Sequence, residues 1–150
     1  MSRFLLAVCA CGLLLSPAFA KEKSPAPPRE ESNQSVQRLP KVNWARIVAS
    51  GTNQRIGFFY AVNPDCSANG DVNIRVTKQP DHGAVETAAA TDFPSFEREN
   101  IRYRCNQQKV RGQQVNYKST EKYTGSDTLE LLVLFPGGFG EEVHINIDVR

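Results

Sequence analysis

The chain is poor in the residues from which catalytic and metal sites are built, with two histidines and four cysteines among 150 residues. It contains no Cys-x-x-Cys motif and no Cys/His spacing that suits zinc, haem or thiol exchange. No serine lies in a nucleophile-elbow sequence, and no glycine-rich loop is suited to binding phosphates. These absences predict a protein that is not an enzyme and that uses no cofactor.

Long apolar runs are also scarce. Only residues 4–15 form one, and about a dozen residues are too few to span a bilayer. Arg3 precedes this run, and the Ala-Phe-Ala sequence at 18–20 fits the small-x-small rule of signal peptidase. Residues 1–20 are therefore predicted to be a cleaved signal peptide, and the mature protein is predicted to be periplasmic or secreted, without a membrane span. An uncleaved anchor and a lipoprotein acylated at Cys11 are the less favoured alternatives.

An excess of charge of one sign is missing as well. After cleavage, 17 basic residues (18 less Arg3) remain against 16 acidic ones, which argues against a nucleic-acid-binding protein. Residues 21–40 are rich in proline and charge but have almost no apolar side chains. They cannot bury enough surface to offset the entropy of ordering, so they are predicted to form a disordered Pro-rich linker. A proline-rich docking peptide is the less favoured alternative.

Two cysteines remain once the signal peptide is removed, namely Cys66 and Cys105. In an oxidising compartment, two cysteines most simply form one disulfide bond. Closing this loop is expected to add roughly 3–4 kcal/mol of stability in the chain-entropy treatment.

From residue 41 onward, apolar and polar residues alternate with a period of two, and turn-forming residues recur about every ten positions. The alternating runs lie at 56–62, 72–76, 101–105, 115–117, 128–135 and 143–149. The run 128–135 is apolar on both faces in its second half, so it is expected to be central or to lie under a loop. No segment has a helical stripe, and residues 86–93 are given one short helical turn at most. The pattern predicts one all-β domain over 41–150, an antiparallel β-sandwich of about seven strands.

Three short motifs follow one another along the second half of the chain. They are Pro-Asp-His-Gly at 80–83, a strand tyrosine at 117, and Tyr-Thr-Gly-Ser-Asp at 123–127, before a closing strand at 143–149. In this order, over about residues 79–149, the chain resembles the cadherin-like and immunoglobulin-like modules of secreted bacterial proteins. The resemblance implies an immunoglobulin-like or cadherin-like sandwich in a bacterial envelope or exported setting, and it implies no enzyme activity.

The same motifs predict a structural turn formed by Pro80, His82, Gly83, Gly125 and Asp127. The His82 imidazole is expected to make one hydrogen bond to nearby loop backbone, and Gly83 is expected to have the positive φ of a tight turn. A ligand role for His82 is the less favoured alternative, because Asp81 is its only sure polar neighbour.

Other polar residues give weaker indications of a metal site. Asp65, Asn69 and Asp71 lie within one turn, but they lack the alternating ligand pattern of an EF-hand, so a solvated turn is favoured over a calcium site. His144 alternates with residues expected to face inward, so it is predicted to face solvent. No metal-binding residues are therefore predicted.

Basic residues gather between 98 and 122, and within the run 101–105 Arg102 and Arg104 are expected to share one strand face. Such a face could meet an anionic polymer or an acidic partner, although a solvated polar face is the simpler interpretation.

Together these features predict a small, exported, non-enzymatic binding or structural module of the bacterial cell envelope. Its partner is expected to be an unidentified protein or an anionic envelope component, and not a nucleic acid. The alternative is a periplasmic enzyme or enzyme inhibitor whose site is assembled from loops and leaves no sequence motif.

Overall fold

The computed structural model describes residues 38–150. The predicted signal peptide and residues 21–37 of the predicted linker lie outside the described residues. The described chain forms seven strands and one 3-10 helix. They are β1 (Lys41–Val48), β2 (Asn53–Tyr60), β3 (Asn73–Lys78), β4 (Gly83–Asp92), η1 (Tyr103–Gln107), β5 (Val110–Ser119), β6 (Gly125–Leu134) and β7 (Gly140–Val149).

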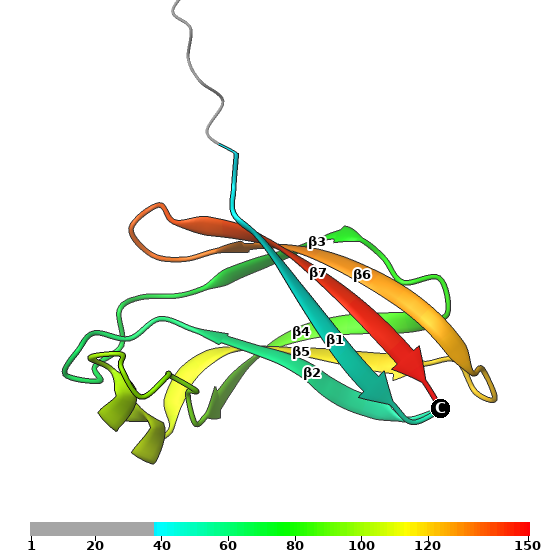
Figure 1. The fold of residues 1–150 in the computed structure, drawn as a ribbon, viewed down its shortest axis with the longest axis horizontal. Coiled ribbons are helices and arrows are strands. Elements are labelled where there is room, and N and C mark those ends of the chain that lie inside the picture. The colour runs from blue at the N-terminus through cyan, green and yellow to red at the C-terminus, as the bar shows by residue number, and fades with distance from the viewer. Residues whose placement is uncertain (1–37) are drawn as a thin grey trace, which may run out of the picture. The chain divides into compact units, whose positions relative to one another are not determined.

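The seven strands form two sheets that pack face to face, which confirms the predicted all-β sandwich (Figure 1). One sheet has the order β1-β7-β6-β3, and the other has the order β2-β5-β4. Strand β6, which contains most of the apolar run 128–135, lies between β7 and β3, as predicted.

The sandwich is not antiparallel throughout, so that part of the prediction is wrong. Strand β1 pairs with β7 in parallel, from Lys41 opposite Glu142 to Val48 opposite Val149, whereas the other four strand pairs are antiparallel. The alternation of apolar residues fixes which face of a strand is buried, but it does not fix the strand's direction. The direction of β1 therefore could not be predicted from its own residues.

The core lies between the two sheets and is built from alternate residues of each strand. In β6 and β7 the buried positions are Leu129, Leu131, Val133, Val143, Ile145, Ile147 and Val149. The facing sheet contributes Val115 and Tyr117 from β5, both with no exposed surface. At the side where β1 and β2 meet, the Trp44 ring stacks on Phe59, with 5.1 Å between ring centroids.

Two segments differ from the conformation that the sequence predicts. Residues 101–105 do not form a strand, because the backbone N–H of Cys105 donates to the carbonyl of Arg102 at 2.8 Å in the 3-10 helix η1. Residues 86–93 do not form a helical turn, because residues 86–92 belong to the ten-residue strand β4, paired along its length with β5. In both segments tertiary contacts override a short local pattern.

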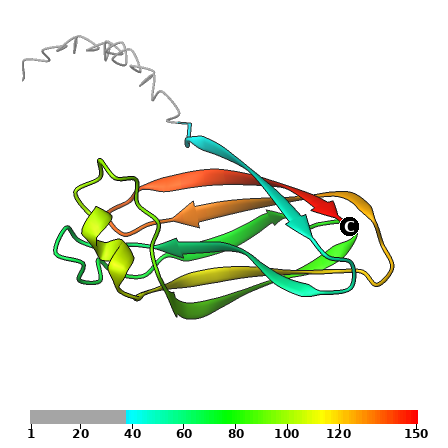
Figure 2. The ribbon, with the colours of Figure 1, turned by 60° about the horizontal axis from the view of Figure 1, so that its bottom comes forward.

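The predicted disulfide is present and joins Cys66 to Cys105, with the two Cα atoms 5.4 Å apart. It connects the loop after β2 to η1, and Figure 2 shows η1 at one end of the sandwich. No helix among residues 38–150 is long and apolar enough to cross a membrane.

Candidate functional site

Asp127, one of the predicted turn residues, is the centre of a buried hydrogen-bonded cluster and is only 4% exposed. Its Oδ1 atom accepts hydrogen bonds from the backbone N–H of Asp81 at 2.9 Å and of Thr128 at 2.8 Å. Its Oδ2 atom accepts one from the backbone N–H of His82 at 2.9 Å and one from the Tyr117 hydroxyl at 2.8 Å. The carboxylate therefore joins the turn before β4 to strands β5 and β6.

The cluster favours an ionised carboxylate at Asp127 and a neutral phenol at Tyr117. Burial alone would raise the pKa of Asp127, but the hydrogen bonds from three backbone N–H groups and from Tyr117 outweigh it, so that pKa lies below its ordinary value. Burial, together with the hydrogen bond to Asp127 and its charge, raises the pKa of the Tyr117 phenol. The pair is therefore suited to bracing the turn and not to exchanging protons near neutral pH.

His82 lies beside this cluster, but its imidazole does not make the backbone hydrogen bond that the sequence predicts. The ring stacks on Tyr123 instead, with 3.9 Å between centroids and 14° between planes. The Tyr123 hydroxyl donates to the carbonyl of Ser126 at 2.8 Å, and Gly125 between them has a φ of +134°. The three motifs at 80–83, 117 and 123–127 thus meet in space.

Gly83 is needed for a different reason from the predicted one. Its φ is not in the positive region, so the prediction of a left-handed turn residue is wrong. A Cβ atom at this position would lie 2.4 Å from the Tyr117 ring, which is far closer than real Cβ atoms approach. Glycine therefore leaves room for the tyrosine that reaches Asp127. Pro80 is buried at the start of the same turn.

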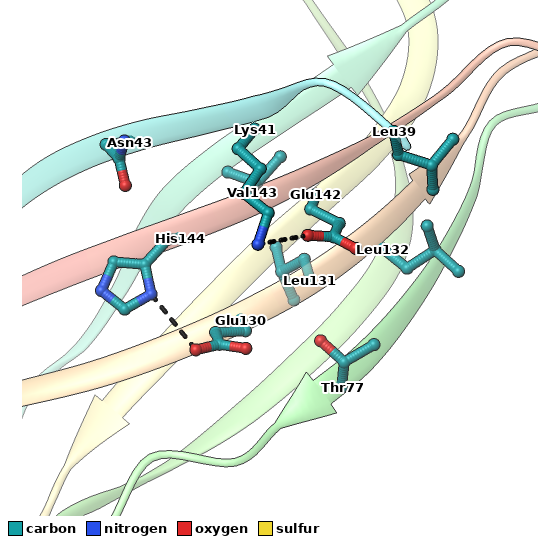
Figure 3. Close-up of a pocket in the computed structure, with 10 residues that line it drawn as sticks. All are labelled: Leu39, Lys41, Asn43, Thr77, Glu130, Leu131, Leu132, Glu142, Val143 and His144. Carbon is teal, nitrogen blue, oxygen red and sulfur yellow. Dashed lines mark ion pairs between the residues drawn. The ribbon is translucent and has the colours of Figure 1, made fainter. Parts of the chain in front are cut away.

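A groove of about 540 Å³ lies on the outer face of the β1-β7-β6-β3 sheet (Figure 3). Its lining includes Leu39, which precedes β1, and Leu132 of β6, and it also includes two ion pairs. Lys41 Nζ lies 3.2 Å from Glu142, and His144 Nδ1 lies 3.4 Å from Glu130. Figure 3 shows both pairs side by side across neighbouring strands. His144 thus lies on the outer face of the sheet, as predicted.

Lys41 and Glu142 neutralise each other, and Glu130 is neutralised by His144 only when the imidazole is protonated. Each ion pair joins residues in register on adjacent strands, Lys41 with Glu142 and His144 with Glu130. All four side chains are at least about a third exposed, so each pair contributes roughly 0–1 kcal/mol of stability. A ligand in this groove would meet little net charge and would have to compete with pairs already formed.

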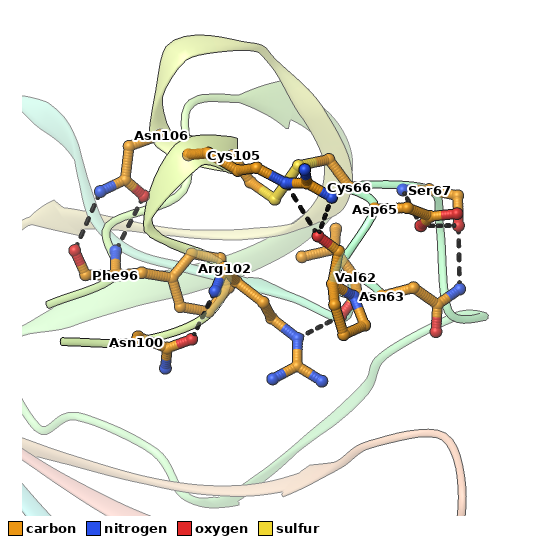
Figure 4. Close-up of a disulfide and its surroundings, with 12 residues drawn as sticks. Val62, Asn63, Asp65, Cys66, Ser67, Phe96, Asn100, Arg102, Cys105 and Asn106 are labelled. Carbon is orange, nitrogen blue, oxygen red and sulfur yellow. Dashed lines mark hydrogen bonds between the residues drawn. A yellow bond between two sulfur atoms is a disulfide. The ribbon is translucent and has the colours of Figure 1, made fainter. Parts of the chain in front are cut away.

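A second surface is formed by residues 93–109, which we call the braced segment (Figure 4). The Cys66–Cys105 disulfide ties it to the loop after β2. The Asn106 side chain accepts from the backbone N–H of Phe96 and donates to its carbonyl, both at 2.9 Å. The segment is therefore held both to the sandwich and to itself.

Arg102 and Arg104 are part of this bracing, and they do not share a strand face as predicted. The Nε atom of Arg102 donates to the Val62 carbonyl at 2.7 Å. The Nε and Nη2 atoms of Arg104 donate to the Pro64 carbonyl at 3.1 Å and 2.7 Å. The two side chains therefore reach carbonyls of the same loop, although neither arginine lies in a strand. Neither guanidinium forms an ion pair with another described residue, although Asp65 lies near enough to Arg104 for their charges to interact.

The braced segment carries a concentration of exposed apolar side chains. Of the six large hydrophobic side chains that are exposed in residues 38–150, three lie here: Phe93 at 51%, Ile101 at 72% and Tyr103 at 42%. The sequence did not reveal this surface, because Ile101 and Tyr103 read as the buried face of a strand. The sequence pattern alone does not show that these residues form the 3-10 helix η1, which the disulfide holds against the loop after β2.

The same segment has an excess of positive charge. Its basic residues are Arg98, Arg102, Arg104 and Lys109, and its acidic residues are Glu97 and Glu99, which gives a net charge of +2. None of these six side chains is in an ion pair with another described residue. The Lys109 ammonium lies 5.6 Å from the centroid of the exposed Phe93 ring.

No group of three or more potential metal ligands occurs in the part of the chain that the structure describes. Asp65 is engaged within its own turn, where it accepts hydrogen bonds from the backbone N–H and the hydroxyl of Ser67 at 3.0 Å and 2.6 Å. These bonds lower the pKa of Asp65.

Comparison with known proteins adds little to this picture. No protein-family model matches the chain, and no curated protein matches it. Among solved structures, the chain is similar to the one described as the solution structure of Amebosin, with 11% identity, 75% of this chain and 99% of that chain covered, and a TM-score of 0.38. A likeness this low supports no conclusion about family or function, so the resemblance to cadherin-like modules stays a prediction.

Proposed function

We propose that the protein is an exported, non-enzymatic module that binds an anionic lipid surface of the cell envelope through the braced segment. The observation that carries this proposal is the coincidence of exposed apolar side chains with unpaired basic ones on one tethered segment. Apolar side chains that enter the lipid interface, flanked by arginine and lysine, are the usual composition of a peripheral membrane-binding surface.

Both kinds of contact are needed for useful affinity. Complete burial of one large apolar side chain contributes about 1.5–3 kcal/mol, and partial insertion contributes less. Each basic residue near an anionic bilayer contributes about 1 kcal/mol. Two or three apolar contacts and a net charge of +2 therefore give weak, reversible and salt-sensitive binding.

The disulfide and the three hydrogen bonds from Arg102 and Arg104 support this use of the segment, because they reduce the conformational entropy that binding would otherwise cost. The groove on the other surface is the weaker candidate. Its charges are already paired, and it exposes no side chain comparable with Ile101.

Vesicle co-flotation of the exported protein tests the proposal, with a matched pair of variants. Ile101→Glu places a charge at a 72% exposed isoleucine of the braced segment, and Ile47→Glu does the same at a 64% exposed isoleucine of β1. We expect wild-type protein and Ile47→Glu to float with phosphatidylglycerol-containing vesicles, and Ile101→Glu to remain behind. Phosphatidylcholine vesicles and added salt should weaken binding by the wild type.

Three results would contradict the proposal: no flotation of the wild type, equal flotation with neutral vesicles, or equal loss in both variants. An envelope protein that protects Ile101 in the absence of lipid would instead support a protein partner for the same segment.

A further inference from the structure

Each sheet of the sandwich has two edge strands, whose outer backbone groups are free to pair with another strand. In one sheet the edges are β1 and β3, and in the other they are β2 and β4. An exposed edge is a template for strand addition unless it is short, bulged, charged or covered. The four edges of this sandwich differ in these features.

Three of the edges are protected. The β1 and β2 edges are tied together by Arg46, whose Nε donates to the Ile56 carbonyl at 2.6 Å. Strand β2 is also interrupted by a register shift at 55–57. Strand β3 has only six residues, a register shift at 76–78 and a lysine at its end.

Strand β4 is less protected: its only charged residues are Glu86 and Asp92, and Asp92, at its end, is paired with Arg55. The strand is ten residues long, it pairs with β5 without a register shift, and it contains no proline, lysine or arginine. Half of its residues are glycine or alanine, so side chains would not keep another strand away. In residues 38–150, β5 is the only strand paired with β4, and no side chain is hydrogen-bonded to the backbone of residues 84–91; Figure 2 shows β4 outermost in its sheet.

We propose that β4 pairs antiparallel with β4 of a second copy of this chain, giving a continuous six-stranded sheet across a two-fold axis. The strand is self-complementary in length, since both partners offer the same unbroken ten-residue ladder. Its charge pattern is also compatible with self-pairing, because its two acidic residues, Glu86 and Asp92, need not face each other.

The side-chain directions restrict the register to two central possibilities. Val85 packs toward the core and lies opposite Tyr117, so odd-numbered residues of β4 face inward and even-numbered residues face outward. In the paired sheet, residues that face inward must lie opposite residues that also face inward. A two-fold axis perpendicular to the sheet satisfies this only if it lies between one residue and the same residue of the second copy. If the axis lies at Thr87, Glu86 faces Ala88 of the second copy, and if it lies at Ala88, Glu86 faces Ala90.

In both registers the two β4 strands overlap along almost their whole length, over residues 83–91 or 84–92. At the end of β4, residues 68–72 flank Ala89–Thr91 across a hollow of about 240 Å³ and make no hydrogen bond to them. Opposite Ala89–Thr91, the second copy would place residues 83–85 when the axis is at Thr87 and residues 85–87 when it is at Ala88. Glu86 is the only charged side chain among them.

Light scattering at increasing concentration tests self-association of the exported protein. Ala88→Glu introduces repulsion in either register, against itself when the axis is at Ala88 and against Glu86 when it is at Thr87. We expect dimerisation of the wild type and a dissociation constant at least about tenfold higher for Ala88→Glu. The control is Gln114→Glu, which adds the same charge directly opposite Ala88 on β5, inside the sheet. It should dimerise like the wild type.

Cysteine pairing then identifies the register. Directly opposite residues of an antiparallel pair have Cα atoms about 4.5–5.5 Å apart, which suits a disulfide. Ala88→Cys should cross-link if the axis lies at Ala88, and Thr87→Cys should cross-link if it lies at Thr87, whereas Gln114→Cys should stay uncross-linked. The proposal is overturned if the wild type is monomeric at every concentration. It is also overturned if a dimer forms but Ala88→Glu does not weaken it and neither Ala88→Cys nor Thr87→Cys cross-links it. Thermal melts establish that each variant is folded.

Discussion

Replacing Asp127 by asparagine is the most informative single change in this fold, because the substitution keeps the shape of the side chain and removes half of its acceptor capacity. Each carboxylate oxygen of Asp127 accepts two hydrogen bonds. An asparagine places an NH₂ group at one of these positions. With the NH₂ group at the Oδ2 position, the Tyr117 hydroxyl can accept from it and donate to the His82 carbonyl, 3.1 Å away. The backbone N–H of His82 then has no acceptor.

The cost follows from what is lost. A hydrogen bond to a charged group contributes about 1.5–3 kcal/mol, and a buried donor left without a partner costs about 1–3 kcal/mol. The bonds from Asp81 and Thr128 remain but become bonds to a neutral amide. We therefore expect Asp127→Asn to lower the free energy of unfolding by about 3 kcal/mol. For a domain of this size, that loss lowers the melting temperature by roughly 10 °C or more.

Urea denaturation with the disulfide intact measures this loss. The control is Asp148→Asn, which neutralises a half-exposed aspartate of β7 that pairs with Arg150 at the surface. That change should cost less than about 0.5 kcal/mol.

The pH dependence provides a second measurement on the same proteins. Because the folded-state pKa of Asp127 is lowered, its carboxylate stabilises the fold fully above the unfolded-state value of about 3.9. This stabilisation is lost as pH falls through the folded-state pKa. The difference in stability between wild type and Asp127→Asn should therefore narrow in acid. A cost below about 1 kcal/mol, or a difference that stays constant below pH ~3.9, would refute the bracing role argued here.

Three further perturbations have defined outcomes. Gly83→Val should destabilise the protein by at least about 1–3 kcal/mol in thermal melts, because the valine side chain would overlap the Tyr117 ring. Ala84→Val, at the next and exposed position, should be tolerated, and equal melting temperatures of the two variants would contradict this reasoning. Reduction of the disulfide should lower the melting temperature by an amount equivalent to roughly 3–4 kcal/mol without unfolding the sandwich, and a chain that unfolds on reduction would show that the core is insufficient. His82→Ala should cost about 0.5–1.5 kcal/mol through the lost ring stack and His82→Phe should restore it, whereas micromolar zinc binding that vanishes in His82→Ala would reveal a ligand role.

The sequence was sufficient to predict the parts of the fold that are specified by long alternating runs. In strand β7, residues 143–149 alternate strictly, and every inward position is apolar, so the buried face of this strand is unambiguous. The disulfide was predictable because only two of the four cysteines lie outside the predicted signal peptide. These features depend on local pattern or on counting, and not on distant contacts.

The features that the sequence did not reveal depend on contacts between distant residues. Strand β4 contains three consecutive alanines, which have no strand preference, and it is extended because β5 provides its partner. Residues 101–105 alternate like a strand, but the disulfide and the hydrogen bond from Arg102 to Val62 hold them as a compact turn. The groove also could not be predicted, because its ion pairs join β1, β7 and β6 across the sheet.

The parallel pairing of β1 with β7 determines how the domain responds to a pulling force. Lys41 begins the pair at one end, and Val149 ends it at the other, with eight residue pairs between the two strands. A tension applied between these two points would slide the strands past each other along their length. All the hydrogen bonds of the pair would then resist together, whereas a hairpin pulled at its open end yields one bond at a time. A domain held at both ends in this way would withstand mechanical load better than its thermodynamic stability alone indicates.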